Sequence, residues 1–220
     1  AGDDIVVGDN GLAMFTETGI LAMLSSETAT DIGGNDDITS GADNDIVIGG
    51  VGDDFINVLR TDGTAVADSG NDILLGDNAT ITFVEDGNDT ITTIAFSDAG
   101  NDSIHSDAGA DIVIAGRGTD TITTGTDNQR DVVAGDNVTA VFTTNSDGRI
   151  DTEKLTTITS TDTSANTTDT DTITTGAGSD VVIGGNATDT IHTNAGDDIV
   201  VGDNATAELD VTVAGDGTVS

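Results

Sequence analysis

The chain has no cysteine, proline, tryptophan or tyrosine, and it has only five phenylalanines. An interior built on large aromatic side chains is therefore not expected. Disulfides are excluded, although a chain of this kind can be held together by metal ions instead. No stretch is long and apolar enough to cross a bilayer, so we expect no membrane insertion.

Basic residues are also scarce: the 220 residues include 5 lysines and arginines against 41 aspartates and glutamates, for a net charge of −36. This charge excludes nucleic acid as a partner, because phosphate binding needs a basic surface. It also opposes compaction by self-repulsion. Composition alone leaves two interpretations open, a disordered chain and a chain that folds when cations neutralise it.

A nine-residue repeat favours the second interpretation. Near its end the chain reads "TGAGSDVVIGGNATDTIHTNAGDDIVVGDN", in which every block has Asp at its sixth place and, in most copies, Gly at its fourth. Aspartate favours turns and is a good ligand for hard cations. The sixth-place residues, our candidate metal ligands, are Asp4, Asp36, Asp45, Asp54, Asp72, Asp89, Asp102, Asp111, Asp120, Asp131, Asp171, Asp180, Asp189 and Asp198.

An aliphatic residue follows two positions after each of these aspartates. A short strand with one apolar centre buries only that centre, since side chains alternate across a strand. One such unit buries almost nothing, whereas stacked units bury a ladder of aliphatic side chains. Stacking also brings carboxylates close together, which is costly unless a cation lies between them. Aspartate carboxylates and turn carbonyls suit Ca²⁺ in particular.

The pattern resembles the calcium-binding nonapeptide G-G-x-G-x-D-x-U-x of the repeats-in-toxin (RTX) family. "GGVGDDFIN" (Gly49–Asn57) fits it at every place, and "AGRGTDTIT" (Ala115–Thr123) and "SDAGADIVI" (Ser106–Ile114) come close. The resemblance implies an all-β parallel β-roll, a β-solenoid with two nonapeptides per coil. It also implies Ca²⁺ held between coils by the sixth-place aspartates and by carbonyls of the glycine-rich turns, and a secreted protein.

The repeat is interrupted after four "GDN" tripeptides, which begin at Gly8, Gly76, Gly135 and Gly202. We expect hairpin or loop insertions at about 11–30, 58–68, 138–165 and 205–220. For the second residue of each tripeptide, a further metal ligand and a simple turn former are both open. The decamer "AGDDIVVGDN" stands at 1–10 and again at 195–204. We therefore expect this sequence to be part of a longer tandem array, or a subunit whose ends continue into neighbouring subunits.

The residues that flank the aliphatic positions alternate in character along the chain. Units such as "TIT" at 172–174 are polar, and units such as "VVI" at 181–183 are apolar. With two units per coil, one sheet would be threonine-rich outside and the other apolar outside. An exposed apolar face is an interaction site, so we expect it to be covered. The predicted cover consists of the segments after each "GDN", which carry Phe15, Phe83, Phe142 and Leu209, or else of a neighbouring molecule.

No catalytic constellation is present, so we expect no enzyme. The predicted function is a calcium-stabilised extracellular or cell-surface structural module: an adhesin extender, a surface-layer protein or a filament subunit. Its partners would be Ca²⁺ and other copies or repeats of itself. One alternative is the C-terminal calcium-binding folding and secretion domain of a secreted enzyme or toxin. Another is an ice-binding module, because threonine is abundant at outward positions.

Overall fold

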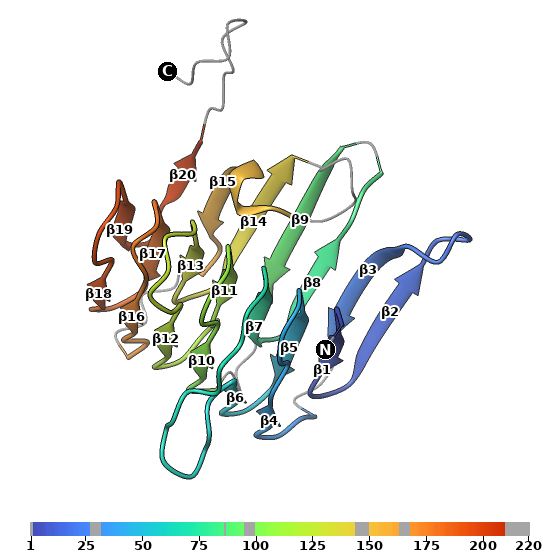
Figure 1. Cartoon of the computed structure of the whole chain (residues 1–220), viewed down its shortest axis with the longest axis horizontal. Coiled ribbons are helices and arrows are strands. Elements are labelled where there is room, and N and C mark those ends of the chain that lie inside the picture. Colours follow the sequence, from blue (N-terminus) through green and yellow to red (C-terminus); the bar gives the residue numbers. More distant parts are fainter. Residues whose placement is uncertain are drawn as a thin grey trace, which may run out of the picture.

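The computed structural model describes residues 2–26, 32–85, 87–94, 100–143, 150–162 and 168–209. These residues form β-strands and one short 3-10 helix, η1 (Thr152–Lys154). The strands build three sheets, which we call the inner, outer and cover sheets, arranged as layers (Figure 1). No helix among the described residues is long and apolar enough to span a membrane.

The inner sheet has seven parallel strands in the order β1-β5-β7-β11-β13-β17-β19. Their bounds are β1 (Ile5–Val7), β5 (Ile46–Gly50), β7 (Ile73–Asp77), β11 (Ile112–Ile114), β13 (Val132–Ala134), β17 (Val181–Gly185) and β19 (Ile199–Asp203). The outer sheet has six parallel strands in the order β18-β16-β12-β10-β6-β4. They are β4 (Asp37–Ile38), β6 (Phe55–Ile56), β10 (Ser103–His105), β12 (Thr121–Thr123), β16 (Thr172–Thr174) and β18 (Thr190–His192).

From β4 onward, the chain alternates between the outer and the inner sheet. This winding, in all-β parallel sheets, is consistent with the predicted roll, and we call the inner and outer sheets together the roll. Pairing is in register, for example Ile122 with Ile173 in the outer sheet and Val133 with Val182 in the inner sheet. Because the register is kept, equivalent places of the nonapeptide stack directly on one another.

The cover sheet consists of the inserted segments. It is antiparallel, with the order β2-β3-β8-β9-β14-β15-β20. Its strands are β2 (Gly11–Phe15), β3 (Leu21–Ser26), β8 (Ala79–Thr82), β9 (Asn88–Thr93), β14 (Val138–Thr143), β15 (Leu155–Ser160) and β20 (Thr206–Glu208). Three hairpins, one after each of the first three "GDN" tripeptides, therefore join into one continuous sheet.

Two apolar cores separate the three layers. The interior of the roll contains predicted members of the aliphatic ladder together with Ala115: Ile38, Val47, Ile56, Leu74, Ile104, Val113, Ile122, Val133, Ile173 and Val182, with Val6 and Ile191 at its ends. The second core lies between the inner and cover sheets and includes Ile48, Ile114 and Ile183, each no more than 1% exposed. The prediction of a covered apolar face is thus confirmed, and the cover is made by the chain itself.

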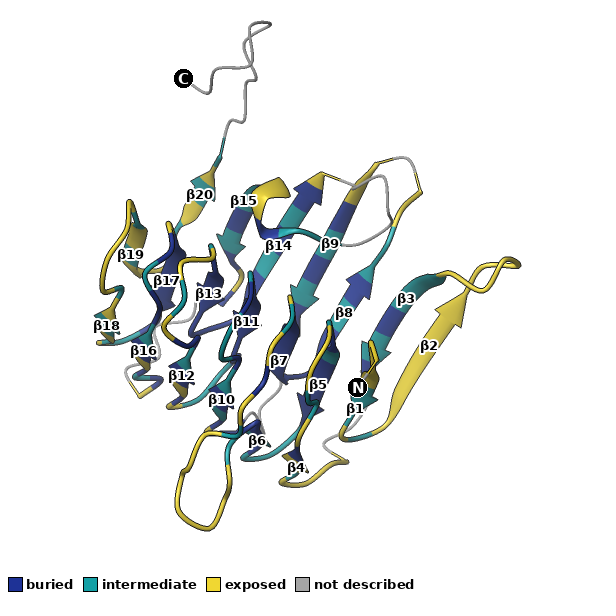
Figure 2. Cartoon of the chain, in the orientation of Figure 1, coloured by how far each residue is buried: buried dark blue, intermediate teal, exposed yellow. Residues whose placement is uncertain are grey.

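The covering side chains differ in how well they are buried. Phe142 is fully buried, and Phe83 and Leu209 pack partly against the same core. Phe15, in contrast, is 56% exposed. It ends β2, the edge strand of the cover sheet, and all of β2 is exposed (Figure 2). The segment that carries Phe15 does cover the roll, through Leu24 and Leu21 of β3. Phe15 itself stays exposed because it lies on the edge strand.

The structure adds one inserted hairpin to those predicted. The predicted loop at 58–68 is a loop, closed by an isolated bridge between Val58 and Ala65. The predicted insertion at 11–30 contains β2 and β3, the one at 138–165 contains β14 and β15, and the one at 205–220 contains β20. Parts of these insertions, at 27–30, 144–149, 163–165 and 210–220, lie outside the described residues. A third hairpin, β8–β9, was not predicted, and Asp89 lies on its second strand instead of in a coil.

Candidate metal sites at the turns of the roll

The sixth-place aspartates form two hydrogen-bonded ladders along the edges of the roll. The main-chain N–H of each aspartate donates to Oδ1 of the aspartate in the next coil, at 2.7–3.0 Å. The inner ladder precedes the inner-sheet strands and contains Asp4, Asp45, Asp72, Asp111, Asp131, Asp180 and Asp198. The outer ladder precedes the outer-sheet strands and contains Asp36, Asp54, Asp102, Asp120, Asp171 and Asp189.

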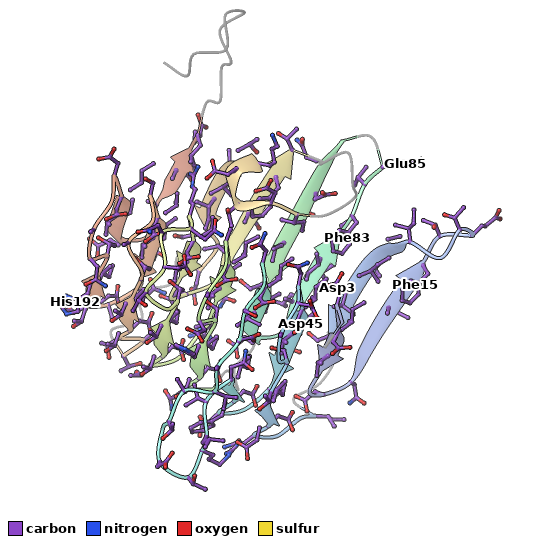
Figure 3. All side chains as sticks on the ribbon, in the orientation of Figure 1. Asp3, Phe15, Asp45, Phe83, Glu85 and His192 are labelled. Atoms are coloured by element: carbon purple, nitrogen blue, oxygen red, sulfur yellow. The ribbon has the colours of Figure 1, made fainter. Side chains whose placement is uncertain are left out.

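Thirteen of the fourteen predicted residues therefore stand in the predicted frame, seven in one ladder and six in the other. Asp89 is the exception: its Oδ1 accepts from the N–H of Val84 and closes the β8–β9 turn. Figure 3 labels Asp45 close to Asp3, which directly precedes Asp4 at the first step of the inner ladder. The structure thus brings together one carboxylate per coil at each edge.

The second carboxylate oxygen of most ladder aspartates has no hydrogen-bond partner. Oδ2 is buried without a hydrogen-bond partner in Asp36, Asp45, Asp54, Asp72, Asp102, Asp111, Asp120, Asp171, Asp180 and Asp189. A buried polar atom without a partner costs free energy, and a buried charge costs more. A ladder of such atoms therefore calls for a compensating cation.

Burial raises the pKa of these carboxyl groups. The pKa of Asp54 rises to about 8 through loss of solvent, with a further increase from repulsion by Asp102. Burial likewise raises the pKa of Asp111 and Asp171 to about 8 each. In the absence of cations, protons would compete for these sites.

The turns that leave the inner sheet form a cradle around five of the six outer-ladder carboxylates. We call these turns the glycine edge, because their first-place residues are Gly8, Gly49, Gly76, Ala115, Gly135, Gly184 and Gly202. A Cβ added at Gly49 would collide with Oδ2 of Asp54 and with the carbonyl oxygen of Gly76 in the next coil. The same convergence of one carboxylate oxygen and one carbonyl occurs over Gly8, Gly76, Gly135 and Gly184. Glycine leaves this space to the oxygens.

Five of the opposite turns, which leave the outer sheet, carry hydroxyl groups at the first place. We call them the hydroxyl edge, with Ser40, Ser106, Thr124, Thr175 and Thr193. The hydroxyl of Thr124 donates to Oδ2 of Asp131, and the hydroxyl of Ser106 lowers the pKa of Asp111. At this edge, hydroxyl groups therefore stabilise part of the carboxylate charge.

Fourth-place glycines allow the coils to approach closely. Gly109 has φ of 156°, and a Cβ there would collide with the carbonyl oxygen of Gly70 in the neighbouring coil. Asp43 and Ala187, two of the non-glycine residues at this place, keep positive φ values of 85° and 67°. The backbone conformation is thus maintained even where the residue does not favour it.

The donor set fits Ca²⁺ better than a transition metal. Within the described ranges, no three carboxylate or imidazole side chains converge into a ready-made metal cluster. The turns instead present single carboxylate oxygens together with main-chain carbonyls, the mixture that Ca²⁺ accepts at high coordination number. The residues present would hold the ion through Oδ2 of the ladder aspartates and the first-place carbonyls, and the ion would supply the missing positive charge.

Two further sets of residues were missed or left open by the sequence. Fifth-place side chains form a second ladder that runs in the opposite direction, as where Asn71 N–H donates to Asn44 and Ala110 N–H donates to Asn71. The other set is the "GDN" aspartates, for which a ligand role and a turn role were both open. Asp77 and Asp136 are buried beside the outer ladder. Their partners lie about forty to fifty residues away, so nothing local in the sequence reveals them.

These features define a class: an all-β protein whose parallel coils are bordered by aspartate ladders and glycine cradles. Comparison with protein families gives the same answer, because the family described as RTX calcium-binding nonapeptide repeat (4 copies) matches residues 32–59, 94–128 and 166–204. These three segments therefore carry RTX calcium-binding nonapeptide repeats, and the resemblance is confirmed. Neither the curated proteins nor the solved structures gave a match.

Proposed function

We propose that this chain is a calcium-stiffened structural module of a secreted or cell-surface protein, without catalytic activity. RTX nonapeptides bind calcium, and the coils here carry that motif in three segments. The observation that carries the proposal is the set of buried Oδ2 atoms that lack a partner along both ladders. Ca²⁺ at these positions neutralises the carboxylates, and neutralisation allows the coils to stack into a rod.

The cover sheet supports a structural role over a simple folding aid. It binds the hairpins of successive coil pairs into one layer, so that the module resists bending as a three-layer slab. Without calcium, repulsion between the acidic surfaces would keep such modules apart. With calcium bound, the remaining negative charge would keep them soluble. In an adhesin, a surface layer or a filament, the same slab would repeat along the fibre axis.

Circular dichroism with and without calcium tests the proposal. In EDTA the chain is expected to lose most of its β signal, and millimolar Ca²⁺ restores it, because binding energy is folding energy in such a site. Extracellular calcium modules commonly bind at about 10⁻⁴ to 10⁻³ M. A spectrum that neither EDTA nor Ca²⁺ changes would contradict the proposal. A catalytic domain in the full-length gene product would favour the secreted-enzyme alternative.

One observation favours ice binding as a second candidate function. A row of hydroxyl side chains crosses the cover sheet from β3 to β20 at one per strand, in the order Ser25, Thr80, Thr92, Thr139, Thr159 and Thr206. They alternate with core residues and so face away from the roll, at the strand spacing of about 4.8 Å. Thermal hysteresis of the calcium-loaded chain, lost on Thr139→Lys but not on the outer-sheet substitution Thr123→Lys, would establish this function. Its absence would exclude it.

A further inference from the structure

The second place of the glycine edge alternates between aspartate and glycine from coil to coil. In sheet order the residues are Asp9, Gly50, Asp77, Gly116, Asp136, Gly185 and Asp203. Backbone pairing places Gly50 opposite Asp77 and Gly185 opposite Asp203. The aspartates belong to the "GDN" tripeptides, from which the hairpins of the cover sheet depart.

The first three of these aspartates, Asp9, Asp77 and Asp136, reach across the glycine of the next coil. Oδ2 of Asp9 accepts from the N–H of Val51 at 2.7 Å, and Oδ2 of Asp77 accepts from the N–H of Arg117 at 2.7 Å. Oδ2 of Asp136 accepts in the same way from the N–H of Asn186.

The intervening glycines leave room for the carboxylates. A Cβ at the second-place glycine of the receiving coil would collide with the carboxylate, as in the case of Gly50 and Asp9. Gly50, Gly116 and Gly185 also have positive φ values, of 121°, 111° and 118°. Glycine at alternate coils is therefore required by the aspartate of the coil before it.

In Asp77 and Asp136 the other carboxylate oxygen is buried without a partner. Asp136 is 1% exposed and Asp77 is 2% exposed, and Oδ1 of each is buried without a hydrogen bond. The N–H of Gly100 faces Asp77 and lowers its pKa, without reaching hydrogen-bond geometry to Oδ1. Asp89 also has a buried oxygen without a partner, but it lies on β9 outside both ladders. At Asp77 and Asp136 the second buried oxygen belongs to a residue that directly follows a glycine-edge cradle, so it is placed for an ion there.

Asp9, Asp77 and Asp136 also directly follow a cradle of the glycine edge. Oδ2 of Asp171 and the carbonyl oxygen of Gly184 converge over Gly135, the residue before Asp136. Oδ2 of Asp102 and the carbonyl oxygen of Ala115 converge over Gly76, the residue before Asp77. Repulsion between these carboxylates accompanies burial in raising the pKa of Asp171 and of Asp77.

We infer that the "GDN" aspartates are additional calcium ligands, so that the glycine edge carries two kinds of site in alternation. Cradles at Gly8, Gly76 and Gly135 have two neighbouring carboxylates, from the ladder and from the tripeptide. Cradles at Gly49 and Gly184 are followed by glycine and lack an aspartate in that position. More ligand charge gives tighter calcium binding. The tighter sites lie at the roots of the hairpins, so calcium fixes the cover sheet to the roll before it fills the remaining cradles.

This inference rests on the proposed calcium-binding function, and Asp136→Asn tests it separately. Asparagine keeps a carbonyl oxygen for the N–H of Asn186 and removes the charge. Calcium binding to the full chain is measured by isothermal titration, with circular dichroism at saturating calcium as the check on folding. We expect one tight site to weaken by about tenfold, since ligand charge sets affinity. Asp77→Asn should weaken a second site, and the double variant should weaken both.

Asp89→Asn is the matched control, because Asp89 is equally buried, also has an unpartnered Oδ2 and lies outside both ladders. Its binding isotherm should equal that of the unchanged chain. If Asp136→Asn does not fold at saturating calcium, Asp9→Asn at the less buried first coil carries the same test. An unchanged isotherm for a folded "GDN" variant overturns the inference and leaves only the turn role. Absence of calcium binding by the unchanged chain would instead overturn the proposed function.

Discussion

The main-chain N–H of Asp54 donates a hydrogen bond of 2.8 Å to Oδ1 of Asp102, 48 residues further along the chain. This bond fixes the carboxylate of Asp102 and leaves its Oδ2 buried without a partner. The same relationship recurs at almost every step of the two ladders. The fold thus holds one oxygen of each carboxylate in place and offers the other to an ion.

Replacing Asp102 by asparagine should affect stability with opposite signs in the two calcium states. Asp102→Asn keeps the acceptor at Oδ1 and removes a buried charge, so the calcium-free roll should become more stable. The calcium-loaded roll should become less stable, because one ion loses a charged ligand. Urea unfolding followed by circular dichroism, in EDTA and in calcium, measures both effects. Asp89→Asn should leave unchanged the increase in unfolding free energy that calcium produces. If Asp89→Asn and Asp102→Asn reduce this increase equally, the role of the ladder is refuted.

Acid should substitute for calcium. Burial raises the pKa of Asp54 and Asp111 to about 8 and of Asp72 to about 7, above the ordinary value of 3.8. A group with a raised folded-state pKa stabilises the fold fully below the unfolded pKa, and that stability is lost as pH rises through the folded pKa. The calcium-free chain should therefore gain β signal as pH falls from about 8 to about 4. A β signal that decreases over this range in EDTA would contradict the account.

Damage to one coil should stay local. Asp180→Ala removes the acceptor of the Asp131 N–H and one carboxylate of the inner ladder. In a stacked repeat, contacts are mostly between neighbouring coils. Hydrogen exchange should therefore rise in β13, β17 and β19 and change little between Asp36 and Asp54. Uniform loss of protection along the chain would show that the coils do not behave as a solenoid.

The cover sheet should contribute unequally to stability along its length. Phe142→Ala removes a fully buried ring from the core between the inner and cover sheets and should cost about 3–5 kcal/mol of unfolding free energy. Phe15→Ala removes a ring from the exposed edge strand and should cost little. Thermal unfolding in calcium compares the two variants. Similar losses would mean that Phe15 packs against the roll after all.

The sequence predicted the parts of the fold that depend on a strict period. The sixth-place aspartates and eighth-place aliphatics recur in frame, and identical places stack because parallel strands pair in register, as Ile122 does with Ile173. The two faces also followed from alternation, since Ile48 and Ile183 belong to apolar units and are buried under the cover sheet. These conclusions needed no knowledge of long-range contacts.

The errors arose where local patterns are ambiguous. Asp89 is followed two positions later by Ile91, and this spacing fits any strand that alternates, so it could not separate a coil from the strand β9. The exposure of Phe15 depends on the position of β2 at the edge of a sheet. The interlock of Asp77 with Gly116 joins residues in neighbouring coils that are far apart in the chain. Only the three-dimensional stacking brings them together.

The most direct test of the central claim is to locate calcium in crystals of the chain by anomalous diffraction. The account predicts ions between successive coils at the glycine edge, beside Oδ2 of Asp54 and the carbonyl oxygen of Gly76 and at the equivalent cradles. It also predicts that the "GDN" aspartates contact the ions at Gly76 and Gly135. Ions found only at exposed carboxylates such as Asp62, with empty cradles in crystals grown in millimolar calcium, would contradict it.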